Sequence, residues 1–224
     1  MLHTLSPILY ILYVNMITKI KPRPNNKIII NIRKIHNINL SVLSFFMLLI
    51  MIKANYQENK FFPLNNLLCK SYNNNYYATI GTNIFLYSKY LEWIDTLFIH
   101  LSNRNISDLH YTHHMTTAFL TYYNINEHVE SIALVPVGLN CFVHIWMYYY
   151  FAYPNGIMKK YRKLITQIQI IQHFIVLSSS IYIKNIDNCK QNKYGIELCI
   201  VLYTMYMVYF SNFYLRTYLI KKIK

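Results

Sequence analysis

Seven apolar segments follow one another along the 224 residues, each about long enough to cross a lipid bilayer as a helix. They cover residues 2–18, 36–52, 76–101, 106–123, 131–151, 164–183 and 194–219. Charged residues make up 13% of the chain, about half of the roughly 25% found in soluble domains. This pattern excludes a soluble globular enzyme and a disordered basic protein. It predicts an all-α, polytopic membrane protein with seven transmembrane helices in a single domain, residues 1–224.

The distribution of basic residues predicts the orientation. The chain has 22 Lys and Arg against 8 Asp and Glu. When the N-terminus is placed in the lumen and the seven segments alternate, most basic residues fall in cytosolic loops, as the positive-inside rule requires. The C-terminus is then cytosolic. Because the basic residues lie between apolar segments rather than on one polar face, they do not indicate nucleic-acid binding.

The four cysteines have no C-x-x-C spacing. Closely spaced pairs are the usual sequence sign of a zinc ribbon, and regular spacings indicate a disulfide framework. The sequence therefore predicts neither for Cys69, Cys141, Cys189 and Cys199.

Three histidines form an H-x-x-H-H box in the fourth segment, at His110, His113 and His114. At 100° per residue, their side chains occupy one stripe of a helix that is otherwise apolar. Clustered imidazoles can bind a metal, move protons or attack a carbonyl. Packing within a helix bundle is the simpler alternative.

Three further polar motifs lie in the third, fifth and sixth segments. They are Lys89-x-x-Glu92-x-x-Asp95-Thr96; Asn140, His144, Met147 and Tyr148; and Thr166, Gln169, Gln172 and His173. Buried salt bridges and interhelical hydrogen bonds are the structural alternatives. At about 1.5 Å per residue, all four motifs lie in the cytosolic half of their segments. This convergence predicts one internal site that is reached from the cytosol.

The four motifs, in this order, resemble those of the ELO family of very-long-chain fatty-acid elongases, which are 3-ketoacyl-CoA synthases of the endoplasmic reticulum. The early Lys21-Pro22-Arg23-Pro24 stretch also resembles a family segment. The resemblance implies six helices in a barrel around an acyl tunnel. The sequence departs from the family pattern at Thr112, Cys141 and Phe151. It also departs at His173, which separates Gln172 from Phe174.

The resemblance implies condensation of acyl-CoA with malonyl-CoA to 3-ketoacyl-CoA, with release of CO2 and CoA. We expect His113 to be the acyl acceptor, His144 to steady an oxyanion with Asn140 or Gln169, and His110 and His114 to orient the box. The expected substrate-binding residues are Lys89, Glu92, Asp95, Thr96, Asn140, Tyr148, Thr166, Gln169 and Gln172. We expect no cofactor and no metal. Separate partner enzymes, a ketoacyl-CoA reductase, a dehydratase and an enoyl reductase, would complete the cycle.

Two other classes of protein stay open. A seven-helix lipid transporter or receptor would use the same segments without catalysis. A di-iron desaturase or hydroxylase would need about eight histidines, whereas His3, His36, His100 and His128 lie away from the predicted site. Near the C-terminus, Lys221 and Lys222 resemble a dilysine signal for retrieval to the endoplasmic reticulum, and a basic cap flanking the membrane is the alternative.

Overall fold

The computed structural model of the chain describes residues 2–57, 64–69, 75–125, 131–186, 189 and 193–220. The described residues form helices and connecting segments and include no β-strand. The expected retrieval residues Lys221 and Lys222 lie outside this described part of the chain.

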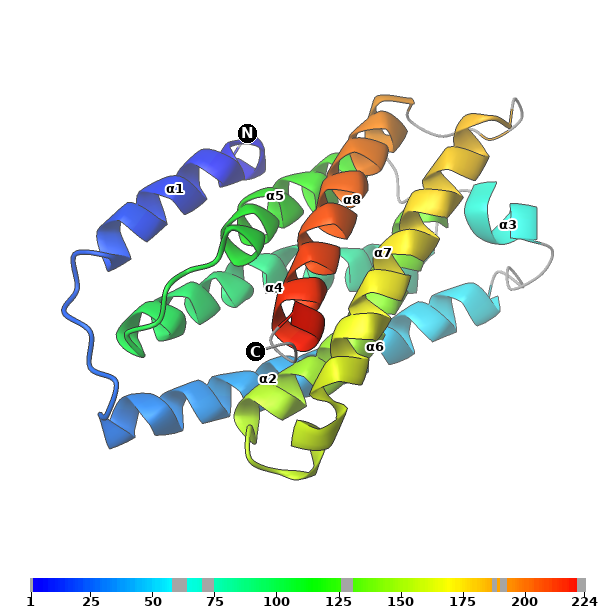
Figure 1. Ribbon diagram of the computed structural model, residues 1–224. Coiled ribbons are helices and arrows are strands. Elements are labelled where there is room, and N and C mark those ends of the chain that lie inside the picture. Colours follow the sequence, from blue (N-terminus) through cyan, green and yellow to red (C-terminus); the bar gives the residue numbers. More distant parts are fainter. Residues whose placement is uncertain are drawn as a thin grey trace.

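Each of the seven expected segments is helical over most or all of its length (Figure 1). The helices are α1 (Ser6–Ile17), α2 (Lys27–Gln57), α4 (Tyr76–Leu101), α5 (Asp108–Ile125), α6 (Ser131–Ala152), α7 (Arg162–Lys184) and α8 (Lys193–Tyr214). Shorter helical pieces are η1 (Leu2–Leu5), α3 (Leu64–Cys69), η2 (Ile157–Tyr161) and η3 (Leu215–Leu219). The start of α2 differs most from expectation, because the helix continues through basic residues such as Lys27 and Arg33 that precede the apolar block.

Three helical stretches of the described chain are long and apolar enough to cross a membrane. They are Lys27–Gln57, Ile157–Lys184 and Lys193–Leu219, and His3–Ile17 is a shorter apolar helix. The stretch Ile157–Lys184 contains α7, so this is the one of the four segments with polar motifs that meets the criterion.

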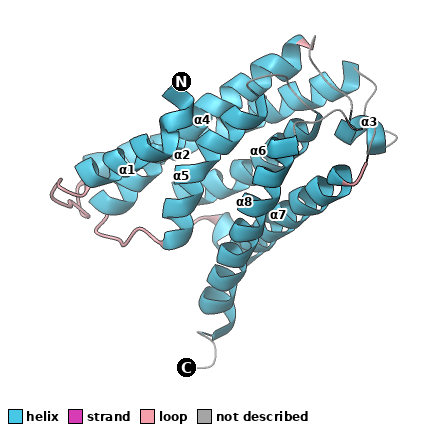
Figure 2. Cartoon of the chain, turned by 90° about the horizontal axis from the view of Figure 1, so that it is seen from above, coloured by secondary structure: helices cyan, strands magenta, loops and turns pink. Residues whose placement is uncertain are grey.

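Helix packing follows a closed order around the bundle. The described helices pack pairwise as α2–α4, α4–α5, α5–α8, α8–α7, α7–α6 and α6–α2. Helix α1 packs against α5 and α4 at one side of this group (Figures 1 and 2). The inward face of α2 carries small polar residues such as Ser41 and Ser44, whereas Phe45, Phe46 and Leu49 on its outer face are exposed. An apolar exterior around a partly polar interior is the arrangement expected in lipid.

One end of the bundle is tied together by contacts between basic residues and loops. Arg33 of α2 donates a hydrogen bond to Ser102 Oγ after α4, at 2.8 Å, and the Arg23 backbone N–H donates to Leu101 O. Lys34 lies over the ring of Tyr153, which follows α6. These contacts place the start of α2 beside the ends of α4 and α6.

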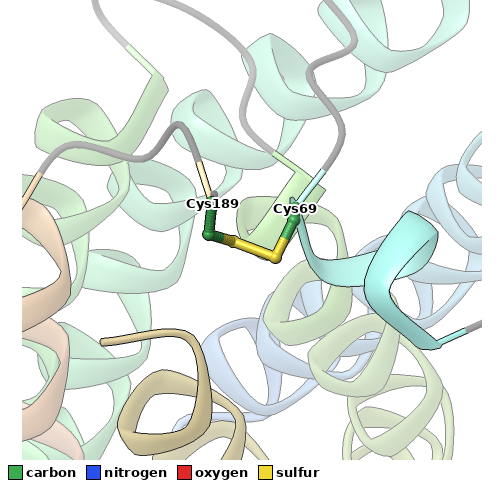
Figure 3. The surroundings of a disulfide bond; sticks show 2 residues. All are labelled: Cys69 and Cys189. Atoms are coloured by element: carbon green, nitrogen blue, oxygen red, sulfur yellow. A yellow bond between two sulfur atoms is a disulfide. The ribbon is translucent and has the colours of Figure 1, made fainter. Parts of the chain in front are cut away.

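The opposite end contains a disulfide between Cys69 of α3 and Cys189, which lies between α7 and α8 (Figure 3). The two residues are 120 positions apart in the sequence, and their Cα atoms are 4.8 Å apart. The expectation that the cysteines form no disulfide framework was therefore wrong for this pair. Spacing along the sequence carries no sign of this bridge, because tertiary packing of α3 against α6 and α7 brings Cys69 to the segment between α7 and α8.

Candidate active site

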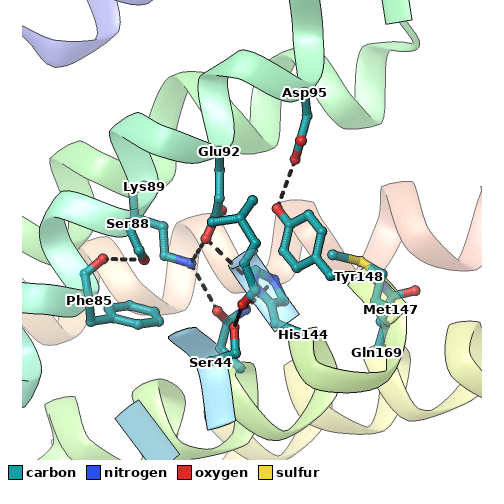
Figure 4. A network of polar contacts seen from close by, with 12 residues as sticks. Ser44, Phe85, Ser88, Lys89, Glu92, Asp95, His144, Met147, Tyr148 and Gln169 are labelled. Atoms are coloured by element: carbon teal, nitrogen blue, oxygen red, sulfur yellow. Dashed lines mark hydrogen bonds and ion pairs between the residues drawn. The ribbon is translucent and has the colours of Figure 1, made fainter. Parts of the chain in front are cut away.

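A buried ion pair occupies the space between α4 and α6. Lys89 Nζ lies 2.8 Å from Glu92 Oε1 and donates a second hydrogen bond to Asn140 Oδ1, at 2.9 Å (Figure 4). Both charged side chains are only 2% exposed. The i, i+3 spacing places Lys89 and Glu92 on one face of α4, and the cation also lies 4.0 Å from the ring centre of Phe85. The two opposite charges pair as a buried site requires, although Glu92 Oε2 has no hydrogen-bond partner within the described residues.

His144 belongs to the same network. Its Nδ1 lies 3.4 Å from Glu92 Oε1, and its Nε2 lies 3.1 Å from Asn140 Nδ2. A neutral imidazole with the proton on Nδ1 satisfies both contacts, since it then donates to the carboxylate and accepts from the amide. Both ring nitrogens are thus engaged, and Asn140 and Glu92 fix the orientation of the ring.

Asp95, the next acidic residue of α4, accepts hydrogen bonds from two other helices. Tyr148 OH of α6 donates to Oδ2 at 2.8 Å, and His36 Nε2 of α2 lies 2.9 Å from Oδ1. His36 therefore contacts a predicted site residue, and the prediction that it lies away from the site was wrong. His36 precedes the recognisable motifs, and its neighbours at helical spacing in α2, Arg33 and Asn39, form no motif with it that would have marked it.

Two residues of the histidine box extend the site toward α1 and α5. Thr96 Oγ1 lies 2.9 Å from His110 Nε2 and 2.9 Å from Tyr10 OH. The rings of His110 and His114 are 4.2 Å apart. Tyr10 is fully buried, and sequence reasoning missed it because a tyrosine in an apolar segment of a tyrosine-rich chain carries no distinguishing signal.

His113, like His114, differs from His110 because its ring makes no hydrogen bond within the described residues. Its Nδ1 is a buried nitrogen without a partner there, as are His114 Nδ1 and His173 Nδ1. Aromatic rings of α8 surround it, with Tyr206 at 5.0 Å and Phe210 at 6.1 Å between ring centres. The residue is nevertheless only half-buried. An unengaged imidazole at the edge of a polar network is available for reaction.

The glutamine motif of α7 is only partly joined to this site. Gln169 donates to Met147 Sδ of α6 at 3.3 Å, and Gln172 is buried. Thr166 instead donates to Arg162 O and lies 3.5 Å from Tyr218 OH, near the end of the bundle that carries η2. The structure therefore brings the predicted residues of α4, α5 and α6 into contact with each other, and it places Thr166 outside this hydrogen-bonded network.

A small cavity of about 40 Å³ lies beyond the polar network. Its lining comes from α4 to α8: Phe85, Leu120, Thr121, Asn124, Ile125, Pro136, Val137, Val176, Cys199 and Tyr203. Phe85 also contacts the Lys89 cation, and the Tyr203 ring contacts Tyr206 beside His113. The polar site and the mostly apolar cavity are thus adjacent.

Comparison with known proteins assigns this arrangement to a family. A model of the ELO family, described as the GNS1/SUR4 family, matches residues 2–224. The chain belongs to this family. An ELO protein of this kind is a multi-pass membrane protein with a role in fatty-acid elongation, and family membership implies acyl-CoA substrates. The non-catalytic and di-iron alternatives give way to this assignment.

Individual relatives agree with the family assignment. The chain is 26% identical over 219 residues to fatty acid elongase sre1 of Dictyostelium discoideum, covering 95% of this chain and 82% of the relative. It is 36% identical over 149 residues to fatty acid elongase A of the same organism, covering 64% and 53%. Very long chain fatty acid elongase 3 of Homo sapiens is 31% identical over 147 residues, covering 63% and 54%.

Proposed function

We propose that this ELO protein is the condensing enzyme of elongation, joining an acyl-CoA to malonyl-CoA to give a 3-ketoacyl-CoA. The observation that carries the proposal is the imidazole of His113, which makes no hydrogen bond within the described residues and packs against His114 and His173. The Lys89–Glu92–Asn140–His144 network lies on the neighbouring helices α4 and α6. A nucleophile without a competing hydrogen bond can attack a thioester carbonyl.

In the first half-reaction a ring nitrogen of His113 bonds to the acyl carbonyl carbon, and the carbon–sulfur bond breaks. The departing CoA thiolate takes the ring proton, which leaves a neutral acyl-imidazole and free CoA. The acyl group stays activated because imidazole is a good leaving group from carbon. His110 and His114, packed 4.2 Å apart, fix the position of the box.

In the second half-reaction malonyl-CoA loses CO2 and becomes an enolate. The enolate carbon bonds to the acyl carbonyl, the carbon–nitrogen bond breaks, and the imidazole regains one proton from solution. Hydrogen-bond donors held in place before reaction stabilise the developing oxyanion. The amides of Asn140 and Gln169 are our candidates, and the engagement of both nitrogens of His144 makes it the residue that orients Asn140.

We assign the acyl chain to the cavity and its surroundings. The contact order α2–α4–α5–α8–α7–α6 supports six helices in a barrel around an acyl tunnel, with α1 outside and seven helices crossing the membrane. The cavity of about 40 Å³ has room for no more than a short stretch of chain. Side chains such as Tyr203 and Val176 therefore move aside when a long acyl chain enters.

The CoA portions are proposed to bind at the end of the bundle that carries η2. A surface pocket of about 630 Å³ is lined there by Gly156, Ile157, Lys159, Lys160 and Arg162. Arg and Lys side chains pair well with phosphate groups. The same basic end would face the cytosol, which agrees with the positive-inside rule.

We place the protein in the endoplasmic-reticulum membrane, with its N-terminus in the lumen and its C-terminus in the cytosol. The disulfide supports this orientation, because disulfides persist in oxidising compartments such as the lumen. The 3-ketoacyl-CoA product requires reduction, dehydration and a second reduction. We therefore expect a ketoacyl-CoA reductase, a dehydratase and an enoyl reductase as functional partners.

The test is condensation by purified protein with radiolabelled malonyl-CoA and a ladder of acyl-CoA lengths. Release of labelled CO2 that depends on acyl-CoA is the expected result for the wild type. His113→Ala is expected to abolish it, whereas His100→Gln, altered at a histidine bonded to Ile20 O, is expected to stay active. Wild-type activity in His113→Ala would reject the nucleophile, and an inactive wild type would reject the condensing function.

A further inference from the structure

We infer that His36 is a positioning residue for the condensation, acting through Asp95 and Tyr148 on the ring of His144. The inference rests on the function proposed above. His36 lies in α2, outside the four motifs, and it reaches the site only through the packing of α2 against α4 and α6.

The carboxylate of Asp95 joins three helices. One oxygen lies 2.9 Å from His36 Nε2 and the other accepts the Tyr148 hydroxyl at 2.8 Å (Figure 4 shows the second contact). A carboxylate held at both oxygens cannot rotate freely about its Cβ–Cγ bond. The donor from α2 therefore fixes the oxygen that anchors Tyr148.

Tyr148 links Asp95 to His144 in the site. Its ring is 1% exposed and meets the His144 ring edge-on, with centres 5.2 Å apart and planes at 87°. His144 in turn lies against Glu92 and Asn140. A shift of Tyr148 would release one side of the imidazole that orients the proposed oxyanion donor.

Because His36 and Asp95 are partly exposed, loss of His36 can disturb the position of Tyr148 without unfolding the protein. The side chains of His36 and Asp95 are 13% and 15% exposed, whereas those of Lys89 and Glu92 are 2% exposed. Water can replace the lost donor at a partly exposed carboxylate, so loss of His36 leaves no dry, unpaired charge. Water does not fix the carboxylate rotation, however, and the geometry at Tyr148 is lost while the fold survives.

The experiment compares His36→Ala and His36→Gln in the full-length protein, with steady-state condensation as the readout. Gln retains an N–H donor and Ala does not. We expect His36→Ala to lower kcat about fivefold, a loss of transition-state stabilisation with both substrate KM values within about twofold of wild type. His36→Gln is expected to recover most of this loss.

Two further variants test the chain of contacts and its location. Tyr148→Phe should lower kcat similarly, and the double variant His36→Ala/Tyr148→Phe should be no slower than the slower single variant, because both break one chain. His3→Ala is the matched control. It removes another histidine hydrogen bond of 2.8 Å, to Tyr90, whose position is about 140° around α4 from that of Asp95, and it should leave kcat unchanged.

The outcomes distinguish the two proposals. An active wild type with unchanged kcat in His36→Ala, or multiplicative losses in the double variant, would overturn the role of His36 and leave the condensing function standing. An inactive wild type would reject the condensing function and the role of His36 with it. If His36→Ala elutes as an aggregate, His36→Leu fills the space without a donor and gives the same comparison with His36→Gln.

Discussion

Lys89 and Glu92 form an ion pair of 2.8 Å inside a bundle whose outer surface is apolar. The pair also holds Asn140 and His144, so it joins the stability of α4 and α6 to the geometry of the proposed site. Its two partners are about one helical turn apart, and each side chain is only 2% exposed to solvent.

Replacing Lys89 by Met should be strongly destabilising, because it leaves the Glu92 charge buried without its main partner. Removing one partner of a buried pair costs about 3–5 kcal/mol. The double variant Lys89→Met/Glu92→Gln should recover part of this loss, since no uncompensated charge remains. Heating followed by fluorescence-detected size-exclusion chromatography would measure the thermal stability of both variants. A double variant less stable than Lys89→Met would contradict the pairing.

The Cys69–Cys189 bridge should stabilise the end of the bundle that carries α3. Cys69→Ser is expected to cost about 2–5 kcal/mol, the usual effect of removing a native disulfide. Cys141→Ser, at a buried free cysteine, is the control for a change of thiol to hydroxyl. Non-reducing electrophoresis after cleavage of the chain between the two cysteines would show the bridge directly. Separation of the fragments without reductant would refute it.

A larger side chain in the cavity should shorten the products. Val137 is 3% exposed and lines the cavity, so Val137→Phe would block space that an acyl chain needs. We expect the distribution of products across an acyl-CoA ladder to move to shorter chains. Val42→Phe, on the exposed outer face of α2, is the control and should leave the distribution unchanged. Equal product profiles for the two variants would argue against an acyl tunnel at this cavity.

Helix α1 should contribute to activity through Tyr10. Tyr10→Phe removes the hydroxyl that lies 2.9 Å from Thr96 Oγ1, next to His110. Loss of one buried hydrogen bond costs about 1 kcal/mol, and we expect a decrease in kcat of a few-fold because Thr96 gains freedom. Tyr13→Phe, whose ring also packs on Trp93, is the matched control and should be close to wild type. Steady-state kinetics of the two variants would decide, and equal kcat values would separate α1 from the site.

Sequence reasoning located the helices and the pairing of side chains within one helix because both depend on local patterns. The H-x-x-H-H box and the Lys89 motif place their side chains on one face by helical geometry alone, and the structure pairs Lys89 with Glu92 as the spacing suggested. The same reasoning missed His36 and Tyr10, and it placed Thr166 with residues that it does not contact. Each of these depends on which neighbouring helix faces the residue.

Apolar segments and their polar motifs determined that this chain is helical, suited to a membrane and similar to elongases, because hydrophobicity and helical period are properties of neighbouring residues. Only the tertiary structure decided which motifs hydrogen-bond to each other, that Asp95 is shared by His36 and Tyr148, and that Cys69 meets Cys189. Those contacts depend on the order in which α2, α4 and α6 to α8 pack, and no single segment contains the distances between helices.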